Sequence, residues 1–180
     1  MIESGPHGNN LILIGFMGCG KSSVGRELAR MVGYDFVDTD ALIVEAAGGR
    51  PIPEQFETEG EERFRERETE ILLGLGERQK LVVSTGGGLP LASKNQEALG
   101  LMGFVIWLDA TADVILERVA VSGDRPLLNV KDPAGTIAKM LAERRPIYEE
   151  VSDLRVETDG LGIQDVAYGV AESARVYFED

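Results

Sequence analysis

The chain has 180 residues, of which 43% are hydrophobic and 27% charged, as is ordinary for one globular domain with a sizeable core. Its formal net charge of −13 opposes binding to nucleic acid and to anionic membrane surfaces. One cysteine and one histidine exclude an internal disulfide and a multi-cysteine zinc site, and argue against a histidine-based catalytic triad. We therefore expect a single, monomeric domain (residues 1–180) in a reducing, cytoplasmic setting, without a nucleic-acid or membrane partner.

The most specific motif follows the first apolar run, residues 11–14. Gly15, Gly20, Lys21 and Ser22 fit the pattern G-x-x-x-x-G-K-[ST] of a P-loop, here residues 15–22. The glycines let backbone N–H groups approach a phosphate, the lysine can reach the β- and γ-phosphates, and the serine hydroxyl can ligate Mg²⁺. A plain glycine-rich turn is the alternative, but a helical apolar pattern follows the motif, as a P-loop requires. We therefore predict a nucleoside triphosphate site.

A second strand is expected at residues 34–40, and its end carries Asp38 and Asp40. In an extended segment, residues two apart project to the same side. Asp38 or Thr39 can also cap the next expected helix, 41–47, and capping is compatible with a role in chemistry. Because ligands gather at the carboxyl ends of strands in open α/β sheets, this pair is a candidate for the site.

A charged helix is expected at residues 54–73. Within it, Glu59 with Arg63 and Glu61 with Arg65 have the i,i+4 spacing of favourable ion pairs. On spacing alone, Arg65 is better interpreted as a solvated surface residue than as part of a site.

Residues 80–85 form a third expected strand, which ends at the glycine triplet Gly86, Gly87 and Gly88. Such a triplet is either a turn or a place where backbone meets a ligand. The triplet follows a strand end at the same sheet edge as the P-loop and the aspartates, which favours ligand contact.

The remaining elements continue the alternation of strand and helix. They are expected at 94–101 (helix), 104–108 (strand), 113–121 (helix), 132–149 (helix), 154–157 (strand) and 163–178 (helix). The alternation predicts an α/β fold, with a parallel five-stranded sheet between two layers of helices.

Several of these segments together resemble the shikimate kinases, small P-loop enzymes of the nucleoside-monophosphate-kinase type. The likeness runs from Leu11 to about Asp159. It rests on the P-loop and the Asp-x-Asp pair, together with Phe64-Arg65-x-x-Glu68, Gly86–Gly88, Arg125-Pro126-Leu127-Leu128 and Glu143-Arg144-x-Pro146-Ile147-Tyr148. The resemblance implies transfer of the γ-phosphoryl group of ATP to the 3-hydroxyl of shikimate, with Mg²⁺ as cofactor.

On the acceptor side, the resemblance implies that Asp40 holds the acceptor hydroxyls. Arg65 and Arg144 would bind the shikimate carboxylate, and the triplet 86–88 would contact the substrate through its backbone. A helical region at about 39–73 would form much of this acceptor site. Arg145 lies beside Arg144; the motif spacing favours Arg144, with Arg145 as the alternative.

On the nucleotide side, the resemblance implies that Ser22 and Asp38 serve the metal. Lys21 and Arg125 would stabilise the transferring phosphoryl group, with Arg125 in a lid at about 118–131, and Arg118 would pack on adenine. The implied nucleotide-binding residues are Gly18, Cys19, Gly20, Lys21, Ser22, Ser23 and Arg118.

Two other functions stay open at this point. One is a related kinase for another carboxylate-bearing polyol. The other is a non-catalytic nucleotide-binding homologue, although such a protein would be expected to lose Lys21, Asp40 or Arg125, and all three are present.

Overall fold

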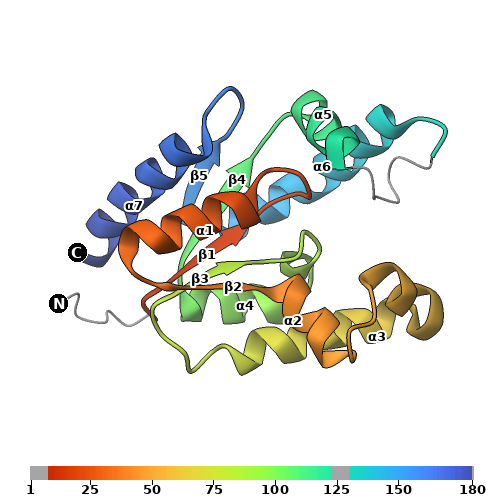
Figure 1. Cartoon of the computed structure of the whole chain (residues 1–180), viewed down its shortest axis with the longest axis horizontal. Helices are drawn as coiled ribbons and strands as arrows, with labels where there is room; N and C mark the ends of the chain where they lie inside the picture. The colour runs from red at the N-terminus through yellow and green to blue at the C-terminus, as the bar shows by residue number, and fades with distance from the viewer. Residues whose placement is uncertain (1–7, 123–129, 180) are drawn as a thin grey trace.

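Five parallel strands form one sheet in the computed structural model, which describes residues 8–122 and 130–179. Their spatial order is β2-β3-β1-β4-β5 (Figure 1). The strands are β1 (Asn10–Ile14), β2 (Asp35–Asp38), β3 (Leu81–Ser84), β4 (Gly103–Asp109) and β5 (Leu154–Glu157). The expected parallel five-stranded sheet is confirmed.

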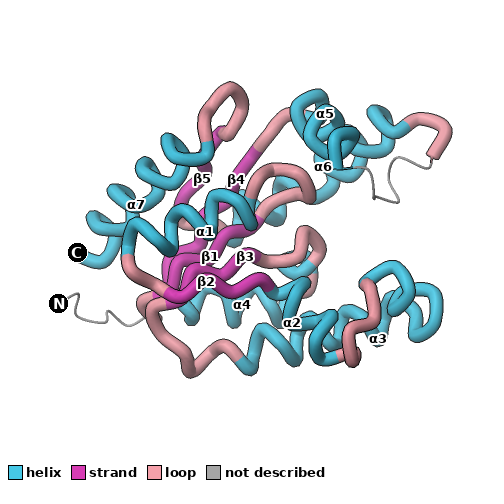
Figure 2. The backbone as a smooth tube through the Cα atoms, viewed as in Figure 1, coloured by secondary structure: helices cyan, strands magenta, loops and turns pink. Residues whose placement is uncertain are grey.

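Helices cover both faces of this sheet. In the described part of the chain they are α1 (Lys21–Val32), α2 (Thr39–Ala46), α3 (Ile52–Gly74), the short 3₁₀ helix η1 (Leu89–Leu91), α4 (Ser93–Met102), α5 (Ala112–Ser122), α6 (Pro133–Val151) and α7 (Ile163–Glu179). Helices α1 and α7 pack together on one face, whereas α4 and α6 lie on the other (Figures 1 and 2). Beyond the carboxyl ends of the strands, the α2–α3 and α5–α6 pairs extend on opposite sides (Figure 1). None of the helices in residues 8–122 and 130–179 is long and apolar enough to span a membrane.

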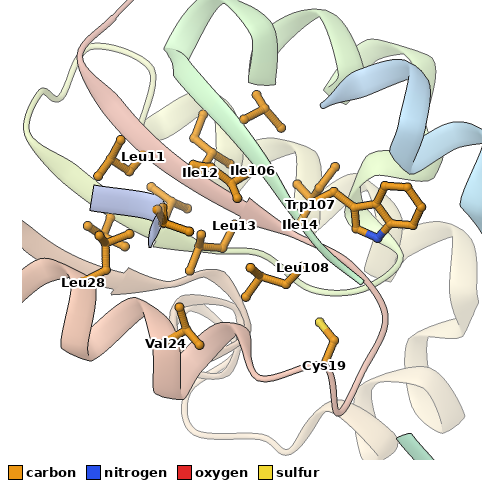
Figure 3. Packing of buried hydrophobic residues seen from close by; sticks show 14 of the residues in the cluster. Leu11, Ile12, Leu13, Ile14, Cys19, Val24, Leu28, Ile106, Trp107 and Leu108 are labelled. Atoms are coloured by element: carbon orange, nitrogen blue, oxygen red, sulfur yellow. The ribbon is translucent and has the colours of Figure 1, made fainter. Parts of the chain in front are cut away.

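The core is centred on the three inner strands β3, β1 and β4, which are buried along their whole length. A strand covered on both faces has no polar side, which explains why β4 is a continuous apolar run from Phe104 to Leu108. Val24 and Leu28 direct the apolar face of α1 towards these strands (Figure 3). The P-loop between β1 and α1 is thus held by a rigid strand and a rigid helix.

The expected strand at 34–40 is too long, because β2 ends at Asp38 and α2 begins at Thr39. The Asp38 carboxylate accepts a hydrogen bond from the Asp40 N–H at 3.0 Å and so caps α2. Asp40 therefore lies in the first helical turn. The expectation that the extended segment continues to Asp40 was wrong, although both aspartates still line one pocket.

Helix α3 is interrupted at Gly60, where φ is 82° and ψ is 167°. This backbone region is open almost only to glycine. The interruption removes the regular i,i+4 spacing between Glu59 and Arg63, so the expected ion pair between them does not form. Glu59 instead binds Arg67 at 2.7 Å and Arg50 at 2.6 Å.

The second expected ion pair of α3 lies beyond Gly60, where the helix is regular. It is confirmed, with Arg65 Nη2 3.3 Å from Glu61 Oε1.

Candidate active site

A pocket of about 400 Å³ lies at the carboxyl edge of the sheet. Its walls come from the P-loop, the β2–α2 junction, the loops after β3 and β5, and helix α5. The lining residues are Met17, Gly18, Cys19, Gly20, Lys21, Ser22, Ser23, Val24, Asp38, Asp40, Ser84, Thr85, Gly87, Arg118, Thr158, Leu161, Ile163 and Val166. Folding therefore brings the P-loop, both aspartates, Gly87 of the glycine triplet and Arg118 around one cavity.

Lys21 is held inside the P-loop by the loop's own carbonyl groups. Its Nζ donates to the Gly15 oxygen at 2.8 Å and to the Phe16 oxygen at 2.9 Å. The loop adopts positive φ at Gly15, Gly18 and Gly20, with values of 137°, 78° and 102°. Each of these conformations is strained for a residue with a Cβ, which explains the glycine spacing of the motif.

Ser22 and Asp38 meet at the base of the pocket. The Ser22 hydroxyl donates to Asp38 Oδ2 at 2.7 Å, and the other Asp38 oxygen caps α2. A hydroxyl and a carboxylate are hard oxygen ligands of the kind that Mg²⁺ prefers. Among the described residues, no group of three or more His, Cys, Asp and Glu could hold a metal by itself. This donor set fits an ion that takes its remaining ligands from phosphate and water.

Asp40 lies against the glycine triplet together with a second carboxylate, Glu68. A Cβ at Gly86 would lie 2.7 Å from Asp40 Oδ1 and 3.0 Å from Glu68 Oε1. Any side chain at this position would therefore displace one or both carboxylates, and only glycine avoids the clash. The Gly86 N–H donates to the Thr39 hydroxyl at 3.0 Å, which ties the triplet to the start of α2.

Arg65 is not the solvated surface residue that its spacing suggested, since its side chain is 30% exposed and is bound to Glu68 at 2.6 Å. Glu68 is buried, and burial raises the pKa of its carboxyl above the ordinary value of 4.5. Arg65 opposes this rise, whereas Asp40 adds to it. A Cβ at Gly88 would collide with the Arg65 guanidinium, so Arg65 lies directly beside the triplet.

Arg144 and Arg145 point to different places. The Arg144 guanidinium lies 5.3 Å from the centre of the Phe16 ring, at the start of the P-loop. Arg145 donates to Asp109 Oδ1 at 3.1 Å and to the Ala110 oxygen at 3.2 Å. Arg145 thus fastens α6 to the end of β4. This arrangement favours Arg144 over Arg145 as the residue that faces the site.

Arg118 reaches from α5 to the P-loop and to the loop after β5. It donates to the Gly18 and Cys19 carbonyl oxygens at 3.4 and 3.3 Å, and to both oxygens of Thr158 at 3.2 Å. Leu161 continues the same wall of the pocket.

Two sets of residues in this site received no role from the sequence. The first is the loop after β5, with Thr158 and Leu161 at the pocket, together with Ile163 at the start of α7. Its position after the last strand is the signal that could have found it, because ligands gather at that edge. The second is Glu68, whose burial no local pattern indicates.

The sequence-predicted residues form two neighbouring groups in the described ranges. Lys21, Asp38, Asp40 and Arg118 line the pocket itself, whereas Arg65 and Arg144 lie beside it, at the glycine triplet and at Phe16. Arg125 and residues 123–129 of the expected lid lie outside the described residues.

A P-loop between strand and helix, with a serine–aspartate pair at its base and acidic and basic groups beside it, defines a P-loop phosphotransferase. A model of the family described as shikimate kinase matches residues 17–175. The chain is 44% identical to a shikimate kinase of Symbiobacterium thermophilum over 91% of this chain and 94% of the relative. It is 45% identical to one of Geobacter sulfurreducens over 93% and 92% of the two chains.

Among solved structures, the fold is similar to the shikimate kinase of Acinetobacter baumannii in complex with shikimate. The TM-score is 0.88 and the sequence identity 38%, over 93% of both chains. The chain belongs to the shikimate kinase family. The predicted family, fold and enzyme class are confirmed.

Proposed function

We propose that this protein is an active shikimate kinase, which converts ATP and shikimate to ADP and shikimate 3-phosphate. The observation that carries the proposal is the position of Asp40. Its carboxylate shares one pocket with Lys21 of the P-loop and adjoins Gly86, beside which lie the Glu68 carboxylate and the Arg65 guanidinium. An acceptor bound at the triplet would thus meet a phosphate bound at the P-loop.

The nucleotide half of the site uses backbone and cationic groups. We propose that the N–H groups of residues 18–23 surround the phosphates and that Arg118 packs on adenine, with Leu161 on the same wall. Lys21 would stabilise the negative charge that spreads over the phosphoryl oxygens in the transition state. The same role for Arg125 rests on the resemblance alone.

The acceptor half of the site grips a carboxylate and orients a hydroxyl. Arg65 and Arg144 would bind the carboxylate of shikimate, since a guanidinium can donate two parallel hydrogen bonds to it. Asp40 would accept hydrogen bonds from neighbouring hydroxyls and orient one of them towards the phosphoryl group, either as a base or as an aligning group. Gly86, Gly87 and Gly88 would contact the acceptor through backbone atoms.

Mg²⁺ is the cofactor that we propose, held by the Ser22 hydroxyl directly and by Asp38 through water. When bound with the nucleotide, it supplies charge neutralisation at the phosphate oxygens. Ser22 and Asp38 already lie 2.7 Å apart, so the protein side of this site is formed by the fold.

The proposals for the assembly and location of the protein rest on its sequence. We propose a monomer with no nucleic-acid partner, working in the cytoplasm.

The test is ADP release, coupled to NADH oxidation, with shikimate, quinate or gluconate as acceptor. We expect turnover with shikimate that far exceeds the rate without acceptor. A rate that shikimate leaves unchanged would exclude the proposed function and favour the non-catalytic homologue. Higher turnover with quinate or gluconate would point to a kinase of another polyol acid.

A further inference from the structure

Tyr148 on α6 joins this helix to the glycine triplet. Its side chain is fully buried, with a relative exposure of 0%, and its hydroxyl donates to the Gly87 carbonyl oxygen at 2.6 Å. Burial raises the pKa of the Tyr148 hydroxyl to about 12, and the nearby Arg144, which lowers this pKa, has a smaller effect. The hydroxyl therefore keeps its proton, and with it the hydrogen bond to Gly87, at any pH at which the protein would work.

The hydrogen bond fixes the direction of one peptide group. A trans peptide is planar and its C=O and N–H point in opposite directions, so a Gly87 carbonyl turned to Tyr148 turns the Gly88 N–H away from Tyr148. Neither the Gly87 nor the Gly88 N–H donates a hydrogen bond to another described residue. Both are backbone donors in a loop that adjoins Arg65 and Asp40.

The same loop is supported from the P-loop side. A Cβ placed on Gly87 would lie 3.4 Å from the Gly15 oxygen and 3.4 Å from the Met17 nitrogen, so the two loops are in close contact. One helical turn before Tyr148, Arg144 lies over the Phe16 ring. Helix α6 thus holds the triplet through Tyr148 and approaches the P-loop through Arg144.

We propose that the Tyr148 hydroxyl is a positioning group for the acceptor, which orients the Gly87–Gly88 peptide so that its N–H faces the acceptor carboxylate. The inference rests on the proposed function, in which Arg65 and Arg144 bind that carboxylate. Tyr148 does not touch the acceptor and acts only through the backbone of the triplet.

The variant Tyr148→Phe removes the hydroxyl and keeps the ring. Loss of one neutral hydrogen bond is worth about 0.5–1.5 kcal/mol, so we expect the KM for shikimate to rise roughly threefold to tenfold. The KM for ATP should stay within about twofold, since the P-loop backbone is unchanged. The matched control is Tyr177→Phe, at a partly buried tyrosine whose ring stacks on Phe104 away from the pocket. It should leave both KM values unchanged.

A second measurement separates positioning from general loss of stability and does not depend on turnover. We expect hydrogen exchange of the amides at 86–91 in Tyr148→Phe to be faster than in the parent protein, with exchange in β1 and β4 unchanged. Unchanged exchange at 86–91 would overturn the proposal whatever the activity. If the parent protein phosphorylates shikimate, two further results for Tyr148→Phe would overturn the proposal: a KM for shikimate equal to that of the parent protein, or an equal rise in the KM values for shikimate and ATP. Absence of shikimate turnover in the parent protein would contradict the proposed function instead.

Discussion

At the residue scale, the carboxylates of Asp40 and Glu68 approach the same glycine, Gly86, from two different helices. Gly86 has no Cβ, and this absence leaves room for both. Arg65 binds Glu68 at 2.6 Å, and this contact gives the buried carboxyl a partner. The neighbouring carboxylates differ in their surroundings, because Asp40 lines the pocket whereas Glu68 is buried behind the triplet. This difference suits Asp40 to contact a substrate and Glu68 to hold Arg65.

The variant Asp40→Ala tests the first of these roles. We expect kcat to fall by a factor of about 10² to 10⁴, the usual contribution of a positioned acid or base. The Kd for ATP, measured by calorimetry, should change less than about twofold. Asp35→Ala, at the exposed start of the preceding strand β2, is the control and should behave like the parent protein. If ATP binding falls as far as kcat does, Asp40 belongs to the metal site.

Glu68 makes stability depend on pH. Its pKa is raised by burial, so the folded state holds the proton more tightly than the unfolded state does. The resulting stability is complete below the ordinary pKa of 4.5 and is lost as pH rises through the raised value. In urea unfolding, we therefore expect Glu68→Gln to gain stability relative to the parent protein as pH rises from about 4 to 7.

Glu59 provides a control, because its pKa is shifted in the opposite direction to that of Glu68. Its hydrogen bond with Arg67 is the main cause that lowers the pKa of its carboxyl, with Arg50 also contributing. Its stabilising effect is therefore present above the ordinary pKa and lost as pH falls. Glu59→Gln should lose stability relative to the parent protein over the same rise in pH. Equal slopes for the two variants would contradict this account.

At the scale of elements, the interruption of α3 at Gly60 joins two helical segments with different contacts. The first segment ends at Glu59, which binds Arg50 before α3 and Arg67 beyond the interruption. The second carries Arg65 and Glu68 to the glycine triplet. The backbone of Gly60 therefore sets the direction in which Arg65 and Glu68 approach the glycine triplet.

Replacement of Gly60 by alanine should destabilise the protein by about 1–3 kcal/mol, the cost of a strained backbone conformation. No atom lies within 4 Å of a Cβ at this position, so the cost comes from the backbone alone. The control is Gly169→Ala in the regular helix α7, where a Cβ also meets nothing within 4 Å. This control should gain about 0.5–1 kcal/mol in urea unfolding. A similar gain for Gly60→Ala would show that the interruption is not required.

At the scale of the whole molecule, the chain has 31 acidic and 18 basic residues, and so a net negative charge. An excess of one sign destabilises the compact state by self-repulsion. Several of the arginines are held at the site or in ion pairs around it, such as Arg65 with Glu68 and Arg67 with Glu59. The surrounding acidic residues outnumber them, so repulsion should dominate the effect of salt on stability.

Salt should therefore stabilise the fold. Between 0.01 and 0.1 M sodium chloride the screening length falls from about 30 to about 10 Å, which weakens repulsion between distant charges more than contacts within an ion pair. We expect the thermal midpoint to rise by a few degrees, with the same rise in potassium chloride. A falling midpoint would mean that surface ion pairs contribute more than the net charge.

The sequence predicted those features that depend on local patterns. The P-loop, the alternation of elements and the ion pair between Glu61 and Arg65 follow from spacing, and the structure contains each of them. The end of β2 at Asp38 did not follow, because capping and strand extension compete for the same residues.

Contacts between distant segments were beyond the reach of local patterns. The partner of Glu59 depends on the backbone of Gly60, and the burial of Glu68 depends on the triplet that packs against it. Similarly, only the position of Asp109 at the end of β4 separates Arg145 from Arg144. Such contacts join residues that lie far apart in the chain, and they require the tertiary fold.

The position of Lys21 has a consequence for how a phosphate enters the P-loop. The residue is only 8% exposed, and its ammonium group already donates to two carbonyl oxygens of the loop. A lysine ammonium has three donors, and the third is directed at the Cys19 sulfur at 3.7 Å. Sulfur is a weak acceptor, so this donor can turn to a phosphate while the other two keep the loop in shape. The group has lost most of its hydration water during folding. The loop is therefore preorganised, and a phosphate would bind to it with little rearrangement of the protein.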